Sequence, residues 1–136
     1  MEVNRVVALP WQCDQFGHIN VRWYAHFFDD ASFQIWAQAG LDLTEMSRGG
    51  IHTVMAQTVT DLKMECKAGD VMAIFGGFTR LGTKSVQLYY ELRSVTSGEV
   101  HATQKAVEVF FDSNTRSSTP MPEEFREKLQ PFVVKL

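Results

Sequence analysis

Hydrophobic residues change their spacing along the chain, and the changes predict one strand, then a long helix, then several strands. Glu2 to Leu9 is rich in β-branched residues and is followed by Pro10, which predicts a first strand. From Asn20 to Ala39 apolar side chains recur every three or four residues, the spacing of an amphipathic helix of about 27–30 Å. We expect Asn20 to cap this helix and Gly40 to end it. Its apolar face consists of Tyr24, Phe27, Phe28, Ala31, Ile35 and Trp36.

Four more strands are predicted after the helix. They run from Thr53 to Glu65, Val71 to Arg80, Ser85 to Val95 and Val100 to Asp112. The turns between them are short and contain glycine, so we expect consecutive strands to be antiparallel neighbours. Gly76-Gly77 is expected to permit a bulge or bend that lets the sheet curl. Pro122 to Gln130 predicts a short C-terminal helix.

These elements predict an α+β protein, in which a curled antiparallel sheet wraps around one long central helix. That arrangement covers every apolar face, whereas a doubly wound fold would need several long helices. A chain of 136 residues is expected to form a single domain, residues 1–136.

Composition and charge narrow the possible partners. The net charge is −3, and no run of five like charges occurs, which argues against nucleic acid as a partner. No apolar stretch approaches the roughly 18 residues of a membrane span, and no secretory signal is recognisable, so we expect a cytoplasmic protein without a membrane partner. Cys13 and Cys66 form no zinc or disulfide pattern, and the histidines lack metal-site spacing. No metal is therefore predicted.

The segment from Trp11 to Asn20 combines reactive side chains directly before the predicted helix. Asp14, Gly17 and His18 lie within five residues of one another. The free N–H groups and the dipole of a helix N-terminus would stabilise a carbonyl oxygen as it becomes an oxyanion. This combination suits acyl transfer, although the same residue types are also common in ordinary loops.

One motif in this region gives the chain a resemblance to a known family. The chain resembles hotdog-fold acyl-CoA thioesterases of the 4-hydroxybenzoyl-CoA thioesterase and YbgC-like group, through Asp14-x-x-Gly17-His18-x-Asn20 followed by Tyr24, Phe28 and Asp30-Ala31. Two turns are also similar to turns of the family, Ala68-Gly-Asp70 and Arg80-Leu-Gly-Thr-Lys-Ser85. The resemblance therefore covers nearly the whole chain. Within the group it is greatest to thioesterases of carnitine and betaine metabolism.

The resemblance implies roles for four catalytic residues. Asp14 would be the catalytic carboxylate, either attacking the thioester carbonyl directly or acting as a base on water. The backbone N–H near Val21 would be the oxyanion donor, and Gly17 would allow the backbone to approach the substrate closely. His18 would orient Asp14 or the water. The departing coenzyme A thiolate needs little help from a general acid, because a thiol has a pKa of about 8.5.

Other residues are expected to bind the substrate. These are Asn20, Tyr24, Arg80, Lys84 and Ser85. An acidic protein must supply local positive charge to bind the phosphates of coenzyme A, for which Arg80 and Lys84 are the first candidates and Lys63 and Lys67 the next. The same cations are equally well explained as solvated turn residues. No cofactor is expected, because coenzyme A is part of the substrate.

We also expect a homodimer, or a homotetramer, in which each site is built from both chains. The sheet has an edge strand to pair, and the resemblance implies that two sheets join edge to edge. Asp14 of one chain would then work with the Arg80 to Lys84 turn of the other. Two other functions stay open: a hotdog hydratase or dehydratase, and an acyl-CoA-binding module without turnover. Asp14 argues against simple binding, because a binding module gains nothing from a carboxylate beside a thioester carbonyl.

Overall fold

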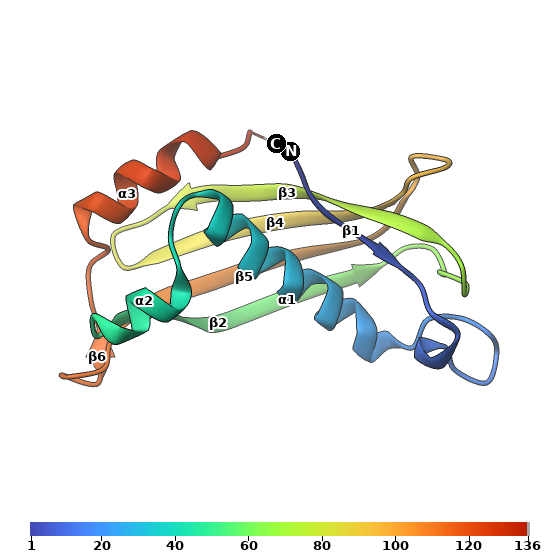
Figure 1. The fold of residues 1–136 in the computed structure, drawn as a ribbon, viewed down its shortest axis with the longest axis horizontal. Helices are drawn as coiled ribbons and strands as arrows, with labels where there is room; N and C mark the ends of the chain where they lie inside the picture. Colours follow the sequence, from blue (N-terminus) through green and yellow to red (C-terminus); the bar gives the residue numbers. More distant parts are fainter. Residues whose placement is uncertain (136) are drawn as a thin grey trace.

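The computed structural model describes residues 1–135 and has the predicted α+β hotdog architecture, in which a curled antiparallel sheet wraps around a long helix (Figure 1). The strands are β1 (Glu2–Val7), β2 (Ile51–Leu62), β3 (Val71–Leu81), β4 (Ser85–Ser94), β5 (Val100–Asp112) and β6 (Ser117–Ser118). The helices are α1 (Val21–Gln38), α2 (Leu43–Arg48) and α3 (Glu123–Leu129), with short 3-10 turns at Pro10–Gln12 and Gln130–Phe132. Sequence patterns did not predict α2 or β6. No helix within residues 1–135 is long and apolar enough to cross a membrane.

Helix α1 begins and ends where the sequence predicts. The Asn20 side chain accepts a hydrogen bond from the Arg22 backbone N–H at 3.2 Å, which satisfies one of the free donors of the first turn. Gly40 follows the helix with a φ of +81°, a left-handed conformation that glycine adopts without strain. All six predicted apolar residues are buried, and so is Ser32. The face of α1 that they form packs against the sheet and makes the centre of the core.

The strand order corrects one prediction. The sheet runs β1-β3-β4-β5-β2, with β6 paired to β5, so β2 and β3 are not neighbours. The segment around Gly69 is therefore a crossover between the two edges of the sheet and not a hairpin. Its residues bond to the N-terminal segment instead, since Gly69 N–H donates to Ala8 O at 2.7 Å and Ala8 N–H donates to Asp70 O at 2.9 Å. The turn residues were recognised correctly, but their partner lies in a distant part of the sequence.

Gly76 and Gly77 lie within β3 and form no bulge at their own position. Their φ angles are +151° and +155°, and a Cβ on Gly76 would collide with the carbonyl oxygen of Tyr89. Pairing with β4 continues through both glycines, and the register shifts between Phe78 and Arg80. The glycines thus let β3 and β4 approach closely, and the irregularity follows two residues later.

Strand β2 forms one edge of the sheet and is open to solvent. Residues 54–62 are all exposed, as are Lys63 and Met64 after them. The alternation of residues 53–65 predicts one face for Thr60, Leu62 and Met64, but within one chain none of these three is covered. Because β2 has a neighbour on one side only, its second edge presents unpaired backbone groups.

Candidate active site

The loop before α1 is a tight turn that fixes the Asp14 carboxylate. Asp14 N–H donates to His18 O at 2.8 Å, and Gly17, with a φ of +79°, donates its N–H to Asp14 O at 3.1 Å. Asp14 Oδ1 accepts the backbone N–H groups of Phe16 at 2.9 Å and His18 at 3.3 Å. Both side-chain bonds use Oδ1, so Oδ2 takes no hydrogen bond within residues 1–135. The backbone therefore orients the carboxylate and leaves one oxygen available.

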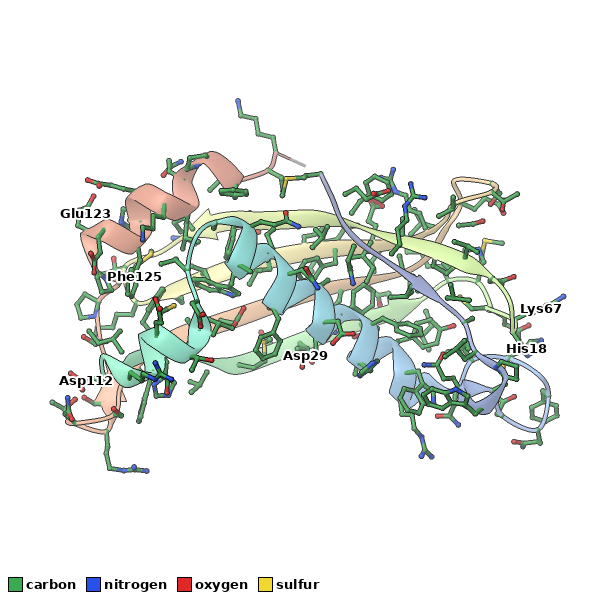
Figure 2. The ribbon with its side chains drawn as sticks, in the orientation of Figure 1. His18, Asp29, Lys67, Asp112, Glu123 and Phe125 are labelled. Atoms are coloured by element: carbon green, nitrogen blue, oxygen red, sulfur yellow. The ribbon has the colours of Figure 1, made fainter. Side chains whose placement is uncertain are left out.

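The segment that follows β2 holds this loop in place. Ile19 N–H donates to Cys66 O at 2.8 Å, and an antiparallel bridge joins His18 to Lys67. Asn20 N–H donates to Gln12 O at 2.9 Å, which ties the loop back to the 3-10 turn before it. Figure 2 shows His18 and Lys67 together at the end of the molecule where α1 begins. The crossover between β2 and β3, which the sequence predicted to be a hairpin turn, therefore supports the loop that carries Asp14.

A cavity of about 490 Å³ opens between this loop, the first turn of α1 and the end of β2. Its lining consists of Asp14, Phe16, His18, Ile19, Val21, Tyr24, Leu62, Lys63, Met64 and Glu65. The backbone N–H of Val21 donates no hydrogen bond within residues 1–135, because the Asn20 cap bonds to Arg22 instead. Val21, whose N–H is unpaired at the positive end of the helix dipole, therefore lines the same cavity as Asp14.

Two weak acids beside the cavity stay protonated. Burial raises the pKa of the Tyr24 phenol and also that of the Cys66 thiol. The Cys66 sulfur lies 3.5 Å from His101 Nδ1, and that nitrogen is also 3.0 Å from the Glu65 carbonyl oxygen. Cys66 is therefore a buried thiol and not a thiolate nucleophile, and His101 packs in the interior.

The side chain of His18 faces a residue that sequence patterns did not single out. Its Nε2 lies 3.1 Å from Glu65 Oε2, whereas its backbone N–H is the group that bonds to Asp14. Nothing in the local pattern around Glu65 shows this contact, because 47 positions separate the two residues. Lys63, a second-rank candidate for binding phosphate, lines the same cavity.

Three of the predicted substrate-binding residues lie at the opposite end of the molecule from the Asp14 loop. Arg80, Lys84 and Ser85 belong to the end of β3, the β3–β4 turn and the start of β4. The start of β3 adjoins the Asp14 loop, and the eleven residues of β3 lead from that point to the turn, ten steps of about 3.3 Å or about 33 Å along the strand (Figure 1). One chain therefore brings together Asp14, Gly17, His18, Asn20, Val21 and Tyr24, but not the turn.

The other histidines lie outside the cavity. His26 Nε2 is 3.6 Å from Asp30 Oδ2 on the exposed face of α1, and His52 packs edge-on against Phe111. Within residues 1–135 no three His, Cys, Asp or Glu side chains gather as metal ligands.

Comparisons with known proteins agree with this fold. The sequence model of the thioesterase-like superfamily matches residues 8–129. Solved structures with the same fold include SAV2348 from Staphylococcus aureus in complex with CoA, with a TM-score of 0.90 and 18% identity over 100% of this chain and 88% of that one. A 1,4-dihydroxy-2-naphthoyl-CoA thioesterase from Synechocystis has a TM-score of 0.85 and 14% identity over 93% of each chain. The probable thioesterase YbaW from Escherichia coli has a TM-score of 0.83 and 21% identity over 96% of this chain and 98% of that one.

No curated protein sequence matches the chain significantly. The family assignment rests on the sequence model, which covers most of the chain, and the likeness to solved structures supports the hotdog fold. The chain therefore belongs to the thioesterase-like superfamily, and its predicted class, a hotdog-fold thioester hydrolase, is confirmed.

Proposed function

We propose that this protein hydrolyses an acyl-CoA thioester to a free acid and coenzyme A, with Asp14 as the nucleophile or general base. The observation that supports this most directly is the shared cavity. It is lined by Asp14, whose carboxylate has one available oxygen, and by Val21, whose backbone N–H is unpaired at the start of α1. Coenzyme A as the thiol component is supported by the CoA-bound relative from Staphylococcus aureus and the acyl-CoA thioesterase from Synechocystis.

Two routes lead from this arrangement to the products. In the first, Asp14 Oδ2 bonds to the acyl carbon and the carbon–sulfur bond breaks, and water then hydrolyses the resulting anhydride. In the second, Asp14 takes a proton from water as the water oxygen bonds to the acyl carbon, and the thiolate leaves. Negative charge develops on the carbonyl oxygen in both routes, where the Val21 N–H and the helix dipole would stabilise it.

The neighbouring residues have supporting roles in this proposal. Gly17 provides the left-handed turn that lets the backbone fold back on Asp14, and Asn20 caps α1 through the Arg22 N–H, which leaves the Val21 N–H unpaired. Tyr24 and His18 both line the cavity, where they would contact the bound substrate or the water.

Replacing Asp14 by Asn tests the role of the carboxylate. The amide keeps the shape and can still accept the two backbone N–H groups, so the fold should survive. The thioesterase rate should fall roughly 10²–10⁴-fold, the range for a positioned acid or base. A panel of acyl-CoAs with a thiol-reactive dye measures this directly. Near-normal turnover by the variant would remove Asp14 from the mechanism, and no thiol release by the wild type would favour a binding module.

The edge strand β2 supports a homodimer as the active unit, and two such dimers would make a homotetramer. β2 is twelve residues long, and its exposed apolar side chains include Val54, Met55, Val59 and Leu62. A long exposed apolar edge is a ready template for pairing with another chain. Two β2 strands paired antiparallel run in opposite directions, so the Asp14 loop of one chain would lie near the β3–β4 turn of its partner. Arg80, Lys84 and Ser85 could then reach the phosphates of coenzyme A.

Mixed dimers test whether the site is shared. An Asp14→Asn chain is co-expressed with an Arg80→Ala/Lys84→Ala chain, and the heterodimer is isolated with two different tags. One of its two sites then combines an intact Asp14 with an intact turn. At sub-saturating acyl-CoA the mixed dimer should be more active than either parent. Activity equal to the mean of the two parents would place Asp14 and its turn in the same chain.

A further inference from the structure

The His18–Glu65 pair is built into the proposed thioesterase site, and neither route above assigns Glu65 a role. His18 Nε2 lies 3.1 Å from Glu65 Oε2, and both residues line the cavity that contains Asp14. An ionised carboxylate only accepts hydrogen bonds, so Nε2 is the ring nitrogen that carries the proton. In the neutral ring Nδ1 then carries no proton, and it takes part in no hydrogen bond within residues 1–135.

Backbone bonds fix both members of the pair. The Glu65 carbonyl oxygen is 3.0 Å from His101 Nδ1, and the next carbonyl, that of Cys66, accepts Ile19 N–H at 2.8 Å. On the other side, His18 N–H bonds to the Asp14 carboxylate at 3.3 Å. The ring of His18 is therefore held at one end by the turn that fixes Asp14 and at the other by the segment after β2.

This pair contributes little to stability. The side chain of Glu65 is 68% exposed and that of His18 is 29% exposed, and ion pairs this open to solvent are weak. The other charged groups near the ring are Asp14 on its own loop and Lys63 across the cavity. The side chain of Lys67 extends away from the molecule, although its backbone pairs with His18 (Figure 2). The contact with the Glu65 carboxylate instead fixes the orientation of the His18 imidazole ring.

We propose that Glu65 is a positioning residue of this site: its carboxylate holds the His18 ring in the Nε2–H tautomer, so that Nδ1 accepts a hydrogen bond from the hydrolytic water and orients it. This inference rests on the proposed function. It holds for both roles of Asp14, because a water must be placed against the acyl carbon, or against the acyl-Asp14 anhydride, in either route. In this role Glu65 acts through His18 and not on the substrate directly.

The tautomer can be measured without any turnover. In protein labelled with ¹⁵N-histidine, at a pH about two units above the ordinary histidine pKa of about 6.5, long-range ¹H–¹⁵N spectra distinguish a protonated from a bare ring nitrogen. The His18 signals, assigned by their loss in His18→Asn, should show a protonated Nε2. Glu65→Ala should convert them to an averaged mixture of tautomers. Glu65→Gln, whose amide oxygen still accepts from Nε2, should restore them. Unchanged His18 signals in Glu65→Ala would overturn the inference.

Kinetics test what the tautomer does. Glu65→Ala should lower kcat about 10- to 100-fold with KM nearly unchanged, the cost of losing orientation in a reacting complex. In the His18→Asn background the same substitution should change kcat no further. The matched control is Asp30→Asn, which breaks the His26–Asp30 pair on the exposed face of α1 and should leave kcat unaltered. The melting temperature of each variant should stay within about 2–4 °C of the wild type.

The outcomes separate this inference from the proposed function. Full hydrolysis by Glu65→Ala, or an equal loss of kcat with and without His18, would overturn the inference and leave the role of Asp14 standing. A wild-type protein that releases no thiol, with Asp14→Asn indistinguishable from it, would overturn both.

Discussion

Asp14 and Glu108 are both carboxylates that accept hydrogen bonds from uncharged donors, yet their surroundings are opposite. Asp14 is partly exposed at the cavity, and its partners are two backbone N–H groups of its own turn. Glu108, in the middle of β5, is only 6% exposed, and its partners are side chains from three other positions in the fold. One carboxylate keeps a free oxygen and access to solvent. Both oxygens of Glu108 accept hydrogen bonds, and the carboxylate has almost no access to solvent.

The donors around Glu108 connect three elements of the core. Ser32 Oγ and Trp36 Nε1 from α1 each donate to Oε2 at 3.2 Å, and Thr53 Oγ1 from β2 donates to Oε1 at 3.0 Å. No cation is among these partners. Burial raises the pKa of the Glu108 carboxyl, an effect that the three hydrogen bonds only partly offset. Hydrogen bonds alone therefore do not make a carboxylate chemically useful, because access for substrate and water is also required.

The sharpest test of this difference compares the stability of two variants. Glu108→Ala leaves two buried donors and one partly buried donor unsatisfied and opens a cavity, so the free energy of unfolding should fall by about 2–4 kcal/mol. Asp14→Asn should change that free energy by less than about 1 kcal/mol while abolishing most activity. Urea denaturation of both variants and the wild type measures the contrast. A Glu108→Ala protein as stable as the wild type would show that the cluster does not hold the core together.

The pH dependence of stability gives the second test. The pKa of the Glu108 carboxyl is higher in the folded than in the unfolded chain, so the folded state binds more protons at pH values between the two. The contribution of Glu108 to stability is therefore greatest below its unfolded pKa of about 4.3. It falls as the pH rises through this window, by up to about 1.4 kcal/mol per unit, and is constant above the raised folded pKa.

Glu108→Gln removes this proton and should remove its share of the slope. The measurement is the difference in unfolding free energy between wild type and variant at several pH values from 4 upward, since this difference cancels the other titrating groups. The unfolding free energy of the wild type minus that of the variant should decrease as the pH rises. A difference that is constant with pH would mean that Glu108 titrates alike in both states.

Local patterns predicted those features that depend on neighbours in sequence. The buried face and the Asn20 cap of α1 follow from spacing and from the chemistry of a helix N-terminus. The loop around Asp14 was located for the same reason, because its turn is closed within five residues. These features are decided by residues close enough in the chain to be compared directly.

Features that depend on distant partners were not predictable in this way. A glycine turn such as that at Gly69 suits a hairpin and a crossover equally well, and only the pairing of β3 with β1 decides between them. Glu65 has no local signature, since its significance comes from His18. Glu108 lies at an inward position of an otherwise ordinary strand, and its donors come from elements 55 to 76 residues away.

The smallest expected effect concerns Thr53, which donates one of the three hydrogen bonds to Glu108 described above and lies on the edge strand β2. Thr53→Val keeps the shape of the side chain and removes its hydroxyl, so the free energy of unfolding should fall by about 1 kcal/mol. Thr58→Val, on an exposed part of the same strand, is the control for the higher strand preference of valine, and it should be neutral or slightly stabilising. Because Thr53 does not line the Asp14 cavity, kcat should be unchanged in both variants. If the two substitutions had equal effects on stability, the Thr53–Glu108 bond would contribute nothing, and β2 would be held to the core by its pairing with β5 alone.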